Sequence, residues 1–104
     1  MIRHIVLFKL REFSSEEERN QALEDVLLNF RSLKGEIPQI REYQVQANIV
    51  EGIASCDVII NSCFDSLADL KAYQTHPAHQ YAVEQNKQWS ESKVVADYYE
   101  TTDY

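Results

Sequence analysis

Hydrophobic and polar residues follow two different spacings along the chain, and each change of spacing marks a predicted element. Residues 2–10, IRHIVLFKL, are rich in β-branched and aromatic side chains and predict a first strand. Between residues 13 and 35, apolar side chains recur every three or four positions, which predicts an amphipathic helix. Ser14 or Ser15 is expected to cap the start of this helix, and Gly35 is expected to end it.

The remaining elements complete a β-α-β-β-α-β order. The pattern predicts a strand at 40–50, a strand at 57–64, a helix at 65–73 capped by Asp65 or Ser66, a helix at 77–89 and a last strand at 93–100. Two β-α-β units in this order are typical of a ferredoxin-like α+β fold, with helices on one face of a four-stranded antiparallel sheet. We therefore expect residues 1–104 to form a single domain.

The first strand is apolar on both of its faces. Its alternate residues place His4, Val6 and Phe8 on one face, and Ile5 and Leu7 on the other. The helices can cover only one face, so something else must cover the second one. We expect a second copy of the sheet to do so, in a two-fold homodimer. The alternative is a monomer with an exposed apolar face.

Composition and charge narrow the classes of partner. Hydrophobic residues make up 44% of the 104-residue chain, and its formal net charge is −7. An acidic surface repels phosphate backbones, so nucleic acid is not expected as a partner. No apolar run approaches the roughly 20 residues that span a bilayer. The basic residues within 2–13 and the lack of a small-residue cleavage site argue against a signal peptide, so we expect a cytoplasmic location.

The segment KAYQTHPAHQY, residues 71–81, concentrates the candidate chemistry. His76-Pro77 should interrupt a helix, since proline breaks the helical ladder but fits the first turn of a new helix. The break would let Tyr73 and His79 face one cavity from either side, with an oxygen and a nitrogen within about 7 Å of each other. A neutral imidazole is suited to abstracting a proton near neutrality, and a tyrosine hydroxyl can donate to a carbonyl or enolate oxygen. His76 is expected to cap the new helix.

Three segments together resemble the Dabb family, the stress-responsive dimeric α/β-barrel proteins. They are MIRHIVLFKL at the start, FDSLADLKAYQTHPAHQ at the third strand and second helix, and VVADY near the end. The resemblance covers nearly the whole chain and implies a ferredoxin-like protomer whose sheet pairs with that of a second subunit. In the plant olivetolic acid cyclase of this family, a tyrosine and a histidine carry out a cofactor-free aldol condensation. They match Tyr73 and His79, and a pocket histidine of the cyclase matches His4.

The resemblance also implies a small-molecule pocket without metal or organic cofactor. The expected lining residues are His4, Val6, Phe8, Leu27, Phe30 and Trp89. The cyclase's helical aromatic pair falls near Val26 and Leu27 in this chain. Because these two residues are aliphatic, the resemblance does not identify the substrate. The function we expect is binding of a small carbonyl-containing molecule, with turnover of the cyclase, lyase or isomerase type. A cofactor-free monooxygenase is a related possibility, since antibiotic-biosynthesis monooxygenases share the barrel.

Each candidate residue also has a structural interpretation. His4 could be a core histidine bonded to a backbone carbonyl, and Tyr73 and His79 could simply join the two helices. A metal held by His4, His76 and His79 is a further alternative. Phe30 and Trp89 could belong to the core. The competing function is a non-enzymatic stress or assembly protein, and the enzymatic hypothesis requires Tyr73 and His79 to be exposed to an open cavity.

Overall fold

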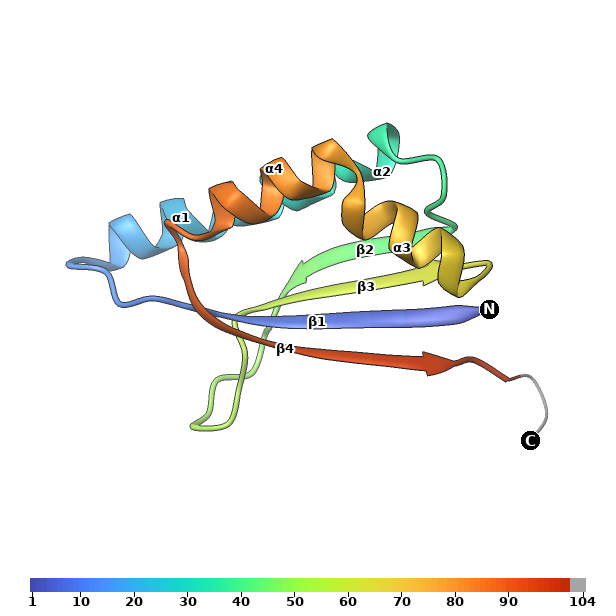
Figure 1. Cartoon of the computed structure of the whole chain (residues 1–104). Coiled ribbons are helices and arrows are strands. Elements are labelled where there is room, and N and C mark those ends of the chain that lie inside the picture. The colour runs from blue at the N-terminus through green and yellow to red at the C-terminus, as the bar shows by residue number, and fades with distance from the viewer. Residues whose placement is uncertain (102–104) are drawn as a thin grey trace.

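The computed structural model describes residues 1–101 and contains one four-stranded antiparallel sheet. The order of strands in the sheet is β2-β3-β1-β4, which is the ferredoxin-like arrangement predicted from the sequence. Along the chain the elements are β1 (Ile2–Leu10), α1 (Glu16–Arg31), α2 (Leu33–Glu36), β2 (Glu42–Ala47), β3 (Val58–Phe64), α3 (Leu67–Thr75), α4 (Pro77–Asn86) and β4 (Ser90–Tyr99). Figure 1 shows all four helices on one side of the sheet.

The predicted helix starts hold, but two predicted helix ends are wrong. The helix expected over 77–89 ends at Asn86. Ser15 caps α1 by accepting a hydrogen bond from the Glu18 backbone N–H, and Ser66 caps α3 in the same way. The prediction that Gly35 ends the first helix is wrong. That helix ends at Arg31, and Gly35 lies inside α2. The reason is that Leu33 and Ile37 are both buried, so a further helical turn packs against the core.

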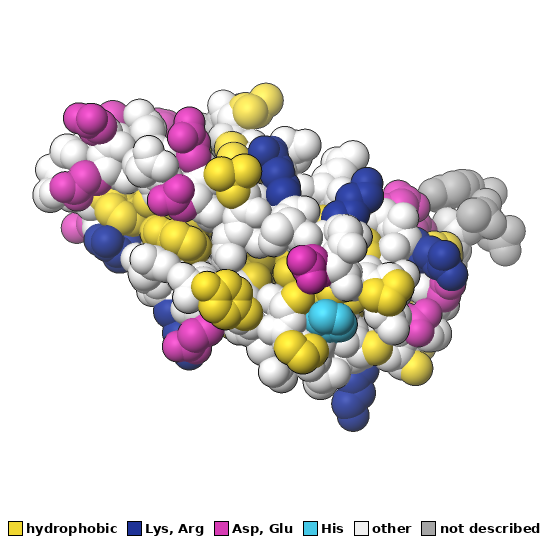
Figure 2. Space-filling view, turned by 90° about the horizontal axis from the view of Figure 1, so that it is seen from above, with side chains coloured by type: hydrophobic (Ala, Val, Ile, Leu, Met, Phe, Trp, Pro, Cys, Tyr) yellow, Lys and Arg dark blue, Asp and Glu magenta, His cyan; other side chains and the backbone are white. Residues whose placement is uncertain are grey.

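The core lies between the helices and the sheet face that carries the even-numbered residues of β1. The buried side chains on this face of β1 and β3 are Ile2, His4, Val6, Phe8, Leu10, Val58, Ile60, Ser62 and Phe64. The helices contribute Val26, Phe30, Leu70 and Tyr73, among others. Seen from the helix side, acidic side chains gather at the end of the molecule where α1 begins (Figure 2), among them the glutamates of its first turn.

The opposite face of the sheet has no helix over it (Figure 1). On this outer face Leu7 pairs with Ile59 on one side and with Val94 on the other, so three apolar side chains form a row across three strands. Leu7 and Ile59 are only half-buried, and Val94 is exposed. The β2–β3 connection projects from the same side (Figure 1) and carries the exposed Ile49, Val50 and Ile53.

In the described part of the chain, no helix combines the length and the apolar character needed to cross a bilayer. The cytoplasmic location expected from the sequence stays a prediction.

Candidate active site between the broken helix and the sheet

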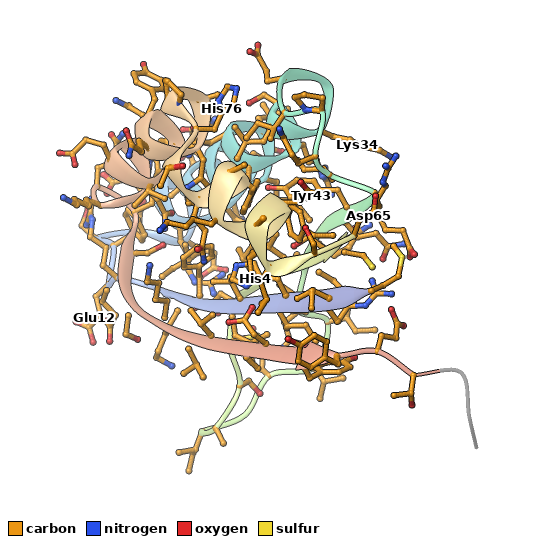
Figure 3. The ribbon with its side chains drawn as sticks, turned by 45° about the vertical axis from the view of Figure 1, so that its right-hand side comes forward. His4, Glu12, Lys34, Tyr43, Asp65 and His76 are labelled. Atoms are coloured by element: carbon orange, nitrogen blue, oxygen red, sulfur yellow. The ribbon has the colours of Figure 1, made fainter. Side chains whose placement is uncertain are left out.

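The break between α3 and α4 is built by His76 and Pro77. Pro77 is the first residue of α4, where its missing N–H leaves no helical hydrogen bond unmade. His76 is in an extended conformation, and its Nδ1 accepts a hydrogen bond from the Ala78 backbone N–H at 3.0 Å. The predicted capping role of His76 is therefore confirmed. Figure 3 shows His76 among the helices, away from the sheet.

The break brings Tyr73 and His79 into contact. Their ring centroids lie 4.4 Å apart, with the ring planes tilted by 52°. The Nδ1–H of His79 donates to the backbone carbonyl of Gln74 at 3.1 Å. In the neutral ring this leaves Nε2 as the basic atom. Tyr73 and His79 thus lie on the same side of the helical region, and their catalytic role stays a prediction.

The surroundings of His79 favour its neutral form. Burial lowers the pKa of His79 below its ordinary value of 6.5, because the charged ring loses solvation. The hydrogen bond to Gln74 acts in the opposite direction, and the positive charges of His4, Lys93 and His76 lower this pKa further. Near neutrality His79 is therefore able to accept a proton.

His4 forms the floor of this region and is paired with an acidic residue that the sequence analysis missed. His4 on β1 is opposite Asp97 on β4, and its Nδ1 is hydrogen-bonded to the Asp97 carboxylate. The His4 ring lies 6.2 Å from the Tyr73 ring. Figure 3 shows His4 in the layer between sheet and helices, and it is buried. The alternation of Lys93, Val95 and Asp97 along the last strand was the available sequence signal.

Tyr43, from β2, is a second residue that the sequence analysis missed. Its hydroxyl lies 3.3 Å from the Tyr73 hydroxyl, and burial raises the pKa of both phenols. Tyr73 is only 2% exposed. The condition that Tyr73 and His79 both open onto a cavity is therefore not met, because Tyr73 is enclosed and only His79 is partly exposed.

The expected lining residues divide into two groups. His4, Val6 and Phe8 lie on the covered face of β1, in line with the Tyr73–His79 region. Phe30 belongs to the core, where its ring stacks on Phe8 with centroids 5.2 Å apart. Leu27 and Trp89 pack at the edge of the core, and Trp89 lines a separate hollow with Arg11 and Phe13. Their role as pocket residues stays a prediction.

A groove runs between α4 and β4. Its defined part has a volume of about 200 Å³ and is lined by Phe8, Val83, Asn86, Lys87, Ser90, Glu91, Ser92 and Lys93. Val83 is one helical turn beyond His79, and Lys93 is opposite Phe8 in the β1–β4 register. The groove thus comes within one helical turn of His79, which does not itself line its defined part.

A metal site is not formed by the histidines. Within residues 1–101, no three His, Cys, Asp or Glu side chains gather in the manner of metal ligands. His76 is used as a helix cap, and His4 is bonded to Asp97.

Comparison with known proteins places the chain in one family. A family model described as Stress responsive A/B Barrel Domain, Dabb, matches residues 2–100. An uncharacterized protein of Streptomyces coelicolor is 39% identical over 98 residues, which cover 94% of this chain and 98% of that protein. A dimeric protein of unknown function with a ferredoxin-like fold, from Bacteroides fragilis, is 34% identical with a TM-score of 0.82, and the match covers 93% of this chain and 93% of that chain.

An enzyme with the same fold is the hydroxynitrile lyase from Passiflora edulis. It superposes with a TM-score of 0.81 over 99% of this chain and 95% of that chain. At 17% identity the likeness shows a shared fold.

Proposed function

Because the chain belongs to the Dabb family of stress responsive A/B barrel domains, we propose that it binds a small carbonyl-containing molecule beside Tyr73 and His79. We also propose that this pair moves a proton on the carbon next to the carbonyl. The reaction would be of the cyclase, lyase or isomerase type and would need neither a metal nor an organic cofactor.

The observation that carries this proposal is the contact between Tyr73 and His79, 4.4 Å between ring centroids. A base and a hydrogen-bond donor must address neighbouring atoms of one substrate, and adjacent rings satisfy that requirement. The hydrogen bond from His79 Nδ1 to Gln74 supports the role of base, because it leaves Nε2 free of a proton.

The proposed step is a proton transfer. Nε2 of His79 takes the proton from the α-carbon, and the electron pair of the broken C–H bond forms an enolate. The Tyr73 hydroxyl donates a hydrogen bond to the enolate oxygen. If the Tyr43 hydroxyl donates to Tyr73 within the 3.3 Å pair, the Tyr73 proton is available for the substrate. Substrate binding must open a path to this hydroxyl.

The burial of Tyr73 favours a second candidate function. A hydroxyl that is enclosed with Tyr43 and surrounded by His4, Phe64 and His79 could serve packing alone. The protein would then be a non-enzymatic stress or assembly protein, and the aromatic cluster would hold α3 on the sheet.

Exchange of hydrogen for deuterium tests the proposal. Small ketones and aldehydes in D₂O exchange their α-protons, and ¹H NMR follows the rate with and without the protein. We expect the protein to accelerate exchange and His79→Ala to remove the acceleration. His76→Asn is the matched control, because it changes the other histidine of the segment while asparagine still caps a helix. The non-enzymatic function would be supported if the protein accelerated α-proton exchange of no probe, or if His79→Ala accelerated it as much as the wild-type protein does.

We also propose that the protein is a two-fold homodimer joined through the outer face of the sheet. The apolar row of Leu7, Ile59 and Val94 supports this assembly. The exposed apolar side chains of the β2–β3 connection project from the same face, so they would enlarge the contact. The relative from Bacteroides fragilis is described as dimeric.

A further inference from the structure

Asn86 lines the α4–β4 groove, and its side-chain amide donor has no partner among the described residues. Asn86 is 6% exposed and lines the groove. Its Oδ1 accepts a hydrogen bond from the Ser90 hydroxyl at 2.9 Å, which fixes the orientation of the amide. Within residues 1–101 the Nδ2 of Asn86 donates to no protein acceptor. Nδ2 is not one of the enclosed polar atoms that lack a partner, so it is accessible from the groove and can donate to a ligand acceptor.

A lysine without an ion pair among the described residues lines the same groove. Lys93 is opposite Phe8 in the β1–β4 register, and within residues 1–101 it forms no ion pair. Lys87, on the same rim, is already bonded to Glu84 at 2.8 Å. Glu91 lines the groove as well, close to the bulge in the β1–β4 pairing. Lys93 therefore remains available for an anion.

His79 lies one helical turn outside the defined part of the groove, and an apolar stretch separates it from Asn86. His79, Val83 and Asn86 are spaced four and three residues apart, so they lie on one face of α4. Seven residues of helix place His79 and Asn86 about 10 Å apart along the helix axis. Phe8 and Val83 line the groove between them. A ligand that fits has a short apolar chain with a polar group at each end.

We propose that the ligand of this groove is a small oxo acid, whose carboxylate is bound by Asn86 Nδ2 and Lys93 Nζ. Its carbonyl lies beside His79, about 10 Å from Asn86 along the axis of α4. An amide donor and an ammonium group together form charge-assisted hydrogen bonds that suit a carboxylate. This inference rests on the proposed function, because it assigns the carbonyl end to the Tyr73–His79 pair.

Binding of matched probes tests the inference. We choose 7-oxooctanoate as the oxo acid and 2-octanone as a ketone that lacks the carboxylate, and measure their dissociation constants by ¹H–¹⁵N NMR titration. We expect the acid to bind more tightly than the ketone and to shift the side-chain amide signal of Asn86. Lys93→Met should weaken binding of the acid about tenfold, because it removes a hydrogen bond to a charged group. It should weaken binding of the ketone far less, and Lys93→Arg should retain acid binding.

Lys87→Met is the matched control, since it removes a lysine of the same rim that is already paired with Glu84. An equal loss with Lys87→Met and Lys93→Met would overturn the inference, because it would indicate general attraction of anions. Equal affinities for the acid and the ketone, or no acid binding at millimolar concentration, would overturn it too. In each of these cases, deuterium exchange of 2-octanone that depends on His79 would still support the proposed function. Failure of the oxo acid inference is therefore distinguishable from failure of the proposed function.

Discussion

The rings of Tyr73 and His79 are in contact, although Tyr73 belongs to α3 and His79 to α4. In one continuous helix of 3.6 residues per turn, side chains six positions apart point in directions that differ by about 120°. They also lie more than one turn apart along the axis. The break at Pro77 changes the direction of the chain and allows the contact. The contact places an imidazole ring beside a phenol ring, and the roles proposed for them can be tested through each partner.

His79→Ala is expected to abolish α-proton exchange and to lower the free energy of unfolding by only about 1 kcal/mol, the usual value of one hydrogen bond. The free energy of unfolding falls because the variant lacks the hydrogen bond from His79 to the Gln74 carbonyl and part of the ring packing. Urea unfolding and the NMR exchange assay measure the two effects. The pair would be structural if His79→Ala lowered the free energy of unfolding by several kcal/mol and the wild-type protein showed no exchange activity.

The pH dependence of stability should carry a contribution from His79. Its pKa in the folded protein is lower than 6.5, so the unfolded chain binds more protons in the window between the two values. Stability should therefore fall as the pH is lowered from about 6.5 to the folded pKa, and should not depend on His79 above that window. His4, His76 and Lys93 lie near this ring, and their positive charges oppose its protonation. Urea unfolding at several pH values should show a flatter curve for His79→Gln. An unchanged curve would contradict the depressed pKa.

The buried hydroxyl pair of Tyr43 and Tyr73 should show coupling. Tyr43→Phe and Tyr73→Phe each leave the other hydroxyl buried without its partner, which costs about 1–3 kcal/mol. The double variant removes both polar groups, so it should cost less than the sum of the two single changes. Urea unfolding of the four proteins gives the coupling energy. Purely additive costs would show that the 3.3 Å contact does not contribute to stability.

Only Tyr73→Phe should also abolish α-proton exchange, since it removes the proposed donor to the enolate. Tyr43→Phe keeps the Tyr73 hydroxyl in place. If the two single variants lost the same fraction of activity, Tyr73 would have no special role as a donor.

The sequence allowed most of the fold to be predicted because its local signals agree with the tertiary structure. Ser15, Ser66 and His76 cap the helices that their side chains indicated, and Pro77 begins α4. The signal failed at Gly35, where burial of Leu33 and Ile37 extends the helical chain beyond a residue that usually ends helices. Tertiary packing prevailed over the local preference there.

The candidate site was predictable only within one segment. Tyr73 and His79 are six residues apart, and the proline between them indicated the break. Alternation along the last strand indicated which face Asp97 occupies, but its pairing with His4 depends on strand register. The contact between Tyr43 and Tyr73 depends on how α3 packs across the sheet, so it could not be predicted. Trp89 was expected at the end of a helix, but α4 ends at Asn86, and Trp89 turns toward Arg11 and Phe13 instead.

Leu7→Asp should disrupt the homodimer. Leu7 lies at the centre of the apolar row on the outer face, between Ile59 and Val94. In the proposed dimer an aspartate at this position would be a buried carboxylate without a partner, and such a charge costs several kcal/mol. The same aspartate in a monomer would be half-exposed and tolerated. We therefore expect Leu7→Asp to convert a dimer into a folded monomer at micromolar concentration. Light scattering measures the mass, and circular dichroism checks the fold.

Gln44→Asp is the matched control for this charge. Gln44 is an exposed residue of β2 on the same face, opposite Asn61 rather than in the apolar row. It introduces the same charge at a polar position, so it should weaken the dimer far less than Leu7→Asp does. A wild-type protein that is monomeric at micromolar concentration would rule out the dimer. Equal weakening by both variants would indicate that charge repulsion between acidic copies, and not loss of the apolar row, separates the subunits.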